Sequence, residues 1–173
     1  MSKLTKLRAM VDRGLGWILV VLMSAMVLNV LWQVFTRFVL RSPSSYTEEI
    51  ARYLLIWVGL LGASYAAGKR LHLAIDLLPA RLEGPSKRYL ALFIESCAFL
   101  FALFVLVVGG SRLVRLTLIL GQHSAALQVP LGYVYLALPL AGLLIMFYSA
   151  VSAADEIRKL QQGETEAPER GAG

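Results

Sequence analysis

Three charged side chains lie together where a long apolar stretch begins, in the segment Thr47-Glu48-Glu49-Ile50-Ala51-Arg52. On a helix, Glu48 and Arg52 are four residues apart and Glu49 and Arg52 are three apart, so both pairs place opposite charges on one face. Pairing lowers the cost of holding Arg52 close to lipid, and it leaves the second carboxylate available for a partner chain. The alternative is ordinary charge compensation at a helix start, where acidic side chains are favoured.

A second candidate is Glu95, which stands inside a later apolar stretch. An ionisable group at membrane depth can carry protons or bind cations. Glu95 is only a few residues from the start of its stretch, however, where a carboxylate is hydrated or pairs with Lys87 or Arg88. We therefore favour structural anchoring at the membrane interface over ion coupling.

The two histidines, His72 and His123, raise the question of haem ligation, since two imidazoles can hold one iron. The topology predicted below opposes this, because it separates them by about 30 Å of hydrocarbon. The sequence contains no phosphate-binding loop, no dinucleotide-binding fingerprint and no context for a serine or cysteine nucleophile. The lone Cys97 has no cysteine partner for a disulfide or a metal site. We predict neither enzyme activity nor a cofactor in this chain.

The elements that position these residues are hydrophobic helices. Of 173 residues, 58% are hydrophobic and 16% are charged, which is more apolar surface than a soluble domain of this length can bury. Residues 14–36 carry no charge and make about 35 Å of helix, enough to cross the hydrocarbon core. Four spans are predicted in this way, at residues 14–36, 50–68, 89–111 and 130–152.

Several local signals refine this plan. Thr47 is the predicted N-cap of the second span, and Pro139 is predicted to kink the fourth. Residues 71–88 mix basic and apolar side chains with two prolines, as in a broken helix that lies on the membrane surface. Residues 112–121 alternate arginine with leucine and predict a second helix, which either lies on the surface or extends the third span. The predicted fold class is an all-α membrane protein of four transmembrane helices with amphipathic surface-lying arm helices.

The distribution of lysine and arginine predicts the orientation in the membrane. Twelve of the 17 basic residues lie before span one, between spans two and three or after span four, and the other five lie in residues 37–52 and 112–128. Because cytoplasmic segments carry the excess of basic residues, both termini are predicted to be cytoplasmic and the two other segments to face outward. Residues 1–162 form one predicted membrane domain, and residues 163–173 a disordered cytoplasmic tail.

Small residues in two spans permit close approach of a neighbouring helix, in this chain or in another. In span two they are Gly59, Gly62, Ala63, Ala66 and Ala67. In span four they are Ala137, Ala141 and Gly142.

Two stretches carry a family resemblance. The first is Tyr46-Thr47-Glu48-Glu49-Ile50-Ala51-Arg52, followed by Trp57, Gly62-Ala63, Lys69, Arg70 and His72. The second is Ser124-Ala125-Ala126-Leu127-Gln128-Val129-Pro130, followed by Tyr133, Tyr135 and Pro139. In their order, spacing and four-span plan, residues 15–152 resemble the small membrane subunit, called DctQ-like, of tripartite ATP-independent periplasmic (TRAP) transporters.

The resemblance implies a transport complex in the bacterial inner membrane. The implied partners are a large multi-span membrane subunit, which carries substrate and sodium, and a periplasmic binding protein, which delivers a carboxylate. This chain would be a non-catalytic scaffold, in contact with membrane lipids and not with nucleic acid. The scarcity of ionisable groups at membrane depth favours the same role independently, because only Arg52 and Glu95 stand within the spans.

Two sets of partner contacts are predicted. Contact with the large subunit is predicted for Glu48, Glu49, Arg52, Trp57 and Gly62. Docking of the binding protein is predicted for the outward segments 37–49 and 121–128, through Arg37, Arg41, Gln122 and His123, with the arginines steering the encounter by charge. The alternative reading of both arginines is a positive flank of span one.

Two other classes of function stay open at this point. The first is an independent small dimeric transporter built around Glu95. The second is the membrane anchor subunit of a respiratory enzyme, which would bind haem.

Overall fold

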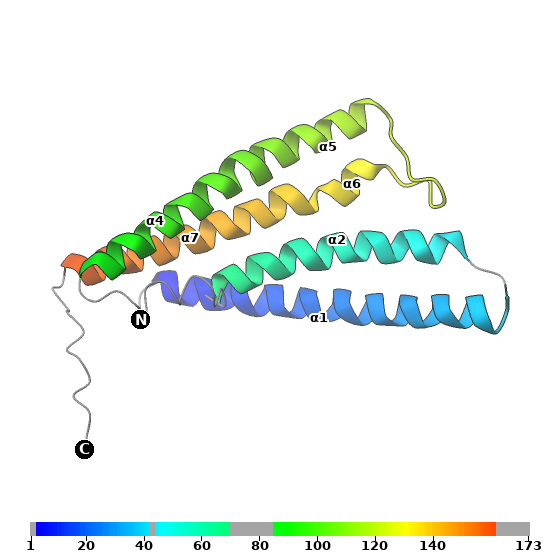
Figure 1. Cartoon of the computed structure of the whole chain (residues 1–173), viewed down its shortest axis with the longest axis horizontal. Helices are drawn as coiled ribbons and strands as arrows, with labels where there is room; N and C mark the ends of the chain where they lie inside the picture. Colours follow the sequence, from blue (N-terminus) through cyan, green and yellow to red (C-terminus); the bar gives the residue numbers. More distant parts are fainter. Residues whose placement is uncertain (1–2, 42–43, 70–84, 162–173) are drawn as a thin grey trace, which may run out of the picture.

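The computed structural model describes residues 3–41, 44–69 and 85–161, and the regular elements within these ranges are helices (Figure 1). Four helical stretches are long and apolar enough to cross a membrane: Lys6–Phe38, Ser45–Gly68, Tyr89–Ile119 and Leu131–Asp155. This confirms the predicted all-α fold with four spans. The predicted tail at residues 163–173 lies outside the described residues.

The first two spans are the helices α1 (Lys3–Phe38) and α2 (Ser45–Gly68), which form an antiparallel hairpin (Figure 1). The prediction that Thr47 is the N-cap of α2 is wrong. Ser44 is the last extended residue, with φ −94° and ψ 114°, and Thr47 lies in the first turn, where its hydroxyl donates to the Ser44 carbonyl at 2.9 Å. The helix begins before the apolar run because Glu48 is favourable in a first turn, where it faces the positive end of the helix dipole.

The third span consists of three segments that follow one another without interruption, α4 (Pro85–Phe101), the π-helical η2 (Ala102–Gly109) and α5 (Gly110–Ile119). Residues 112–119 therefore extend the third span. The predicted fold class included a second helix that lies on the membrane surface here, and α5 does not form such a helix. The other predicted arm, at residues 71–88, falls mainly on residues 70–84, outside the described ranges.

The fourth span is interrupted near its start. It consists of α6 (Leu131–Tyr135) and α7 (Ala137–Gln161), with the break at Leu136. Pro139 has no backbone N–H to donate to the Tyr135 carbonyl, four residues earlier, and the helical bonding resumes where Leu140 donates to the Leu136 carbonyl at 3.3 Å. The kink predicted at Pro139 takes the form of a break in the helix at Leu136, three residues before the proline.

The spans lie side by side in the order α1, α2, α7 and α4–η2–α5, because α2 packs against both α1 and α7, and α7 packs against α4 and η2 (Figure 1). A small core of Leu15, Leu61 and Tyr148 forms where α1, α2 and α7 meet. Large apolar side chains elsewhere are exposed, including Trp17 and Leu28 on α1 at 67% each, as lipid contact requires.

Small residues bring α7 close to η2 and α2. A Cβ atom at Gly142 would lie 2.8 Å from the Leu106 Cβ and 3.1 Å from the Val107 backbone nitrogen. Ala137 and Ala141 are fully buried, and the buried Ser64 hydroxyl on α2 contacts the Ala141 carbonyl at 3.2 Å. The close approach predicted for span four is thus confirmed, with neighbours in this chain.

The glycines of span two behave differently. A Cβ atom added at Gly59 or at Gly62 would meet no atom within 4 Å among the described residues. These two positions therefore provide no close helix approach within this part of the chain.

Candidate functional site

The loop between α5 and α6 has a defined backbone conformation, and its first part is the C-terminal cap of α5. Gly121 adopts φ +59°, and its N–H donates to the Leu118 carbonyl at 3.2 Å while the Gln122 N–H donates to the Thr117 carbonyl at 3.0 Å. This pair of bonds is a Schellman motif, in which glycine fits the left-handed position without strain. Across the loop, the Ser124 N–H donates to the Val129 carbonyl and the Leu131 N–H to the Gln122 carbonyl, both at 2.9 Å.

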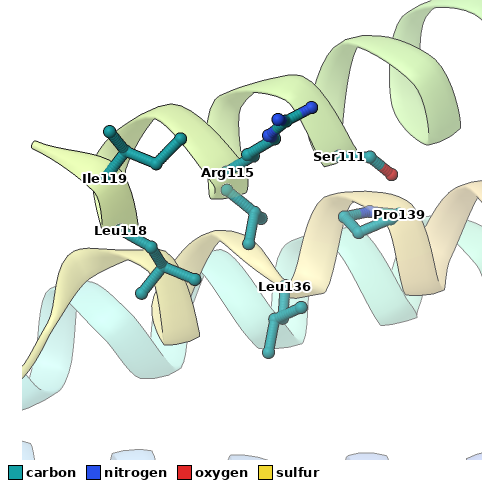
Figure 2. A pocket seen from close by; sticks show the side chains of 7 residues that line it. Ser111, Arg115, Leu118, Ile119, Leu136 and Pro139 are labelled. Atoms are coloured by element: carbon teal, nitrogen blue, oxygen red, sulfur yellow. The ribbon is translucent and has the colours of Figure 1, made fainter.

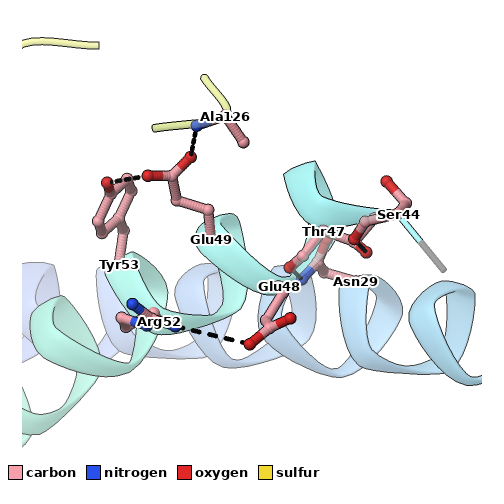
Figure 3. Close-up of polar contacts among 8 residues, drawn as sticks. All are labelled: Asn29, Ser44, Thr47, Glu48, Glu49, Arg52, Tyr53 and Ala126. Atoms are coloured by element: carbon pink, nitrogen blue, oxygen red, sulfur yellow. Dashed lines mark hydrogen bonds and ion pairs between the residues drawn. The ribbon is translucent and has the colours of Figure 1, made fainter. Parts of the chain in front are cut away.

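Glu49 joins this loop to α2 (Figure 3). One carboxylate oxygen accepts hydrogen bonds from the backbone N–H groups of Ala126 and Leu127, at 3.0 and 2.8 Å, across 77 and 78 residues of sequence. The other accepts a hydrogen bond from the Tyr53 hydroxyl at 2.6 Å, and the Ser124 side chain is buried nearby. We call Glu49, Tyr53, Ser124, Ala126 and Leu127 the Glu49 cluster. It fixes the loop to the start of α2 with charge-assisted hydrogen bonds.

The other charged pair of this region lies on the surface. Glu48 and Arg52 form the predicted i,i+4 ion pair at 3.6 Å, with side chains that are 66% and 69% exposed. The predicted i,i+3 pairing of Glu49 with Arg52 is not observed, because the Glu49 carboxylate turns toward the loop (Figure 3). An exposed pair of this kind contributes only about 0.3–0.5 kcal/mol to stability.

Asn29 adds a contact that the sequence pattern did not reveal. Its side-chain amide donates to the Thr47 carbonyl at 2.8 Å, joining the last third of α1 to the first turn of α2. A single asparagine in an apolar stretch is the only sequence signal for it.

A second polar cluster lies at the opposite end of α2, where α1 starts. Asp12 accepts a hydrogen bond from the Tyr148 hydroxyl at 2.7 Å and forms an ion pair with Lys69 at 2.9 Å. Arg8 donates to the Gly68 carbonyl at the end of α2. We call these five residues the Asp12 cluster. It joins α1, α2 and α7, and the hydrogen bond to Asp12 raises the pKa of Lys69 above its ordinary value.

Replacing Tyr148 with phenylalanine is expected to lower the free energy of unfolding by about 1 kcal/mol, because the Asp12 carboxylate loses a hydrogen bond in a part-buried position. Thermal unfolding of the purified chain in mild detergent measures this. The control is Tyr133→Phe, since that side chain is 58% exposed and forms no hydrogen bond with a described residue. Equal unfolding midpoints for the two variants would contradict the prediction.

The residues predicted to contact the large subunit are divided by the structure. Glu48, Arg52 and Gly62 lie at or near the surface, whereas Glu49 faces the loop and Trp57 packs against the core of α1, α2 and α7. Which of them a partner touches stays a prediction.

The four residues predicted to dock the binding protein are all exposed. Arg37 lies in the last turn of α1 and Arg41 just after that helix, whereas Gln122 and His123 lie on the loop after α5. These two segments are at the same end of the bundle (Figure 1). Neither Arg37 nor Arg41 forms an ion pair with a described residue. His123 contacts the Gly121 carbonyl through Nδ1 at 2.7 Å, so its ring lies close to its own loop.

The remaining candidates give a mixed outcome. Glu95 is partly buried in α4 and interacts with another part of the chain. His72 lies outside the described residues, so the predicted separation of His72 from His123 stays a prediction. Among the residues that are described, no group of three or more His, Cys, Asp or Glu side chains could hold a metal ion.

Comparison with known proteins adds the family. The sialic acid TRAP transporter small permease protein SiaQ of Vibrio cholerae is 26% identical over 145 residues, which cover 84% of this chain and 82% of that protein. The C4-dicarboxylate TRAP transporter small permease protein DctQ of Rhodobacter capsulatus is 28% identical over 106 residues, covering 59% of this chain and 44% of that protein.

A third relative is much longer than this chain. The sialic acid TRAP transporter permease protein SiaT of Haemophilus influenzae is 29% identical over 119 residues, which cover 66% of this chain but only 18% of SiaT. Residues 26–159 match the family model for the DctQ component of tripartite ATP-independent periplasmic transporters. This range begins within α1, ends near the end of α7 and includes the Glu49 cluster. The chain is therefore a multi-pass membrane transport protein and not an enzyme, and it belongs to the DctQ family, the small permease component of TRAP transporters.

Proposed function

We propose that this chain is a scaffold, which holds the stationary part of a large membrane subunit in the bilayer while another part of that subunit moves substrate and sodium. The observation that carries the proposal is the use of its polar side chains. Glu49 and Asp12 each bind groups of this same chain, and so they join its helices to one another. A transport site needs polar groups that face a passage for the substrate instead.

The longer relative supports a direct partnership with a large subunit. This chain corresponds to only 18% of the length of SiaT, which is named as a permease protein without the word small. When the small-subunit segment is part of one polypeptide with a longer permease, the two occur in a ratio of one small-subunit segment to one permease. We propose the same ratio for the separate chain and its large subunit.

The substrate is proposed by chemical class. SiaQ is named for sialic acid and DctQ for C4-dicarboxylates, and both substrates are carboxylates. We propose a carboxylate for this transporter too, delivered by a periplasmic binding protein and taken up with sodium.

The proposed orientation places both termini in the cytoplasm. The start of α1 and the end of α7 lie at the same end of the bundle, as an even number of spans requires (Figure 1). The excess of lysine and arginine at this end supports a cytoplasmic location for it. The Glu49 cluster and the loop after α5 then face the periplasm.

The test of the scaffold proposal is reconstitution of the large subunit in vesicles with and without this chain. We expect the large subunit alone to lose stability in detergent and to transport more slowly. Equal transport rate and equal stability in the two preparations would overturn the proposal. Binding of labelled substrate to this chain alone would favour the independent transporter built around Glu95.

A second test concerns the outward segments. We expect charge reversal of Arg37 and Arg41 together to weaken docking of the binding protein about tenfold at low ionic strength, because exposed charges steer encounter over a distance that salt shortens. The matched control reverses Lys6 and Arg13, two exposed basic residues near the other end of α1. Transport measured at limiting binding protein should fall only in the first variant. Unchanged transport there would leave both arginines as flanks of span one.

A further inference from the structure

A groove runs along α5 beside the break between α6 and α7 (Figure 2). It is lined by Ser111, Arg115, Leu118 and Ile119 from α5 and by Leu136 and Pro139 from the fourth span, and its volume is about 380 Å³. The walls are mainly apolar. The groove lies where Pro139 interrupts the fourth span, and the Arg115 side chain extends along α5 on the side of Ser111 (Figure 2).

Arg115 is the charged group of this groove, and nothing described in the chain neutralises it. The side chain is exposed and forms no ion pair or hydrogen bond with any described residue. Its depth is set by the 31-residue span Tyr89–Ile119, which is about 45 Å long. With the middle of that helix placed at the bilayer centre, Arg115 stands about 16 Å from the centre, whereas the hydrocarbon core extends about 15 Å. An unpaired guanidinium at this boundary favours an anion beside it.

We propose that the groove binds an anionic phospholipid, with the phosphate on the Arg115 guanidinium and one acyl chain that runs from there toward the bilayer centre, against Leu136 and Pro139. Lipid phosphates lie just outside the hydrocarbon core, at the depth of Arg115. Guanidinium offers paired donors that match a phosphate group. The groove follows the axis of α5, which is also the direction of an acyl chain.

Charge favours an anionic headgroup over a zwitterionic one. Arg112 lies on the same helix, three residues before Arg115, is also exposed and also forms no ion pair with a described residue. Two positive charges within one turn attract a lipid with net negative charge, such as phosphatidylglycerol. A carboxylate from a partner protein would match the charge but would leave the apolar wall of the groove open to lipid.

The experiment is native mass spectrometry of the full chain in detergent, titrated with phosphatidylglycerol. We expect Arg115→Gln to weaken binding about tenfold, because a charge-assisted pair with phosphate is lost. The matched control is Arg112→Gln, which removes the same charge from the same helix but does not line the groove. It should change binding by less than about threefold.

A third variant separates a lipid from free phosphate. Leu136→Trp fills the groove without changing any charge, and we expect it to weaken phosphatidylglycerol binding while inorganic phosphate fails to displace the lipid from the wild type. Equal binding by Arg115→Gln and Arg112→Gln would overturn the proposal. So would loss of a co-purifying large subunit in Arg115→Gln with lipid binding unchanged, since that result would assign Arg115 to a protein contact.

Discussion

Replacing Gly142 with alanine is expected to lower the free energy of unfolding by about 1–3 kcal/mol, because the added methyl group has no space. It would lie 2.8 Å from the Leu106 Cβ and the Val107 Cγ2, and 3.1 Å from the Val107 backbone nitrogen. Backbone cannot turn away as a flexible side chain can, so α7 and η2 must separate. Thermal unfolding in mild detergent, followed by helical circular dichroism, measures the loss.

The matched control for this variant is Gly59→Ala. Both substitutions raise helix propensity, by up to about 1 kcal/mol, but a methyl group at Gly59 meets no atom of the described residues within 4 Å. We expect Gly59→Ala to be neutral or stabilising. If Gly142→Ala behaved in the same way, the close packing of α7 against η2 would be refuted.

Replacing Glu49 with alanine is expected to release the loop between α5 and α6. The Ala126 and Leu127 N–H groups and the Tyr53 hydroxyl would lose their acceptor in a part-buried place, at a cost of about 2–4 kcal/mol. Amide hydrogen exchange measures this loss of local stability directly, at the backbone N–H groups of Ala126 and Leu127. We expect Ala126 and Leu127 to exchange at least about tenfold faster, since about 1.4 kcal/mol of local stability corresponds to that factor.

Glu48→Ala is the control for the loss of one carboxylate at the start of α2. It removes the exposed ion pair with Arg52 and the favourable charge in the first turn, so the free energy of unfolding should change by about 1 kcal/mol or less, and the two loop amides should exchange as in the wild type. Unchanged exchange at both amides in Glu49→Ala would show that the loop keeps its shape without the carboxylate.

These variants also separate what local pattern can predict from what it cannot. Apolar length and scarcity of charge predicted four spans, and Pro139 predicted a kink in the fourth, because both effects depend only on one continuous stretch of sequence. The Glu48–Arg52 pair was predicted for the same reason.

The partners of Glu49 and Asp12 depend instead on which helices are neighbours. Glu49 binds a loop 77 residues later, and Asp12 binds a tyrosine 136 residues later. Periodicity says which face a residue occupies but not what that face meets. The same limit applies to the small residues, since Gly142 meets η2 while Gly62 meets no described atom, although both stand among similar neighbours in sequence.

The arrangement of the spans in one row has a mechanical consequence for the complex. The Glu49 and Asp12 clusters lie near opposite ends of α2, about 30 Å apart along its axis. Each joins the hairpin of α1 and α2 to the hairpin that the third and fourth spans form. A scissoring rotation of one hairpin against the other would have to break hydrogen bonds near at least one membrane surface. We therefore expect the four spans to resist shear across the bilayer as one rigid unit.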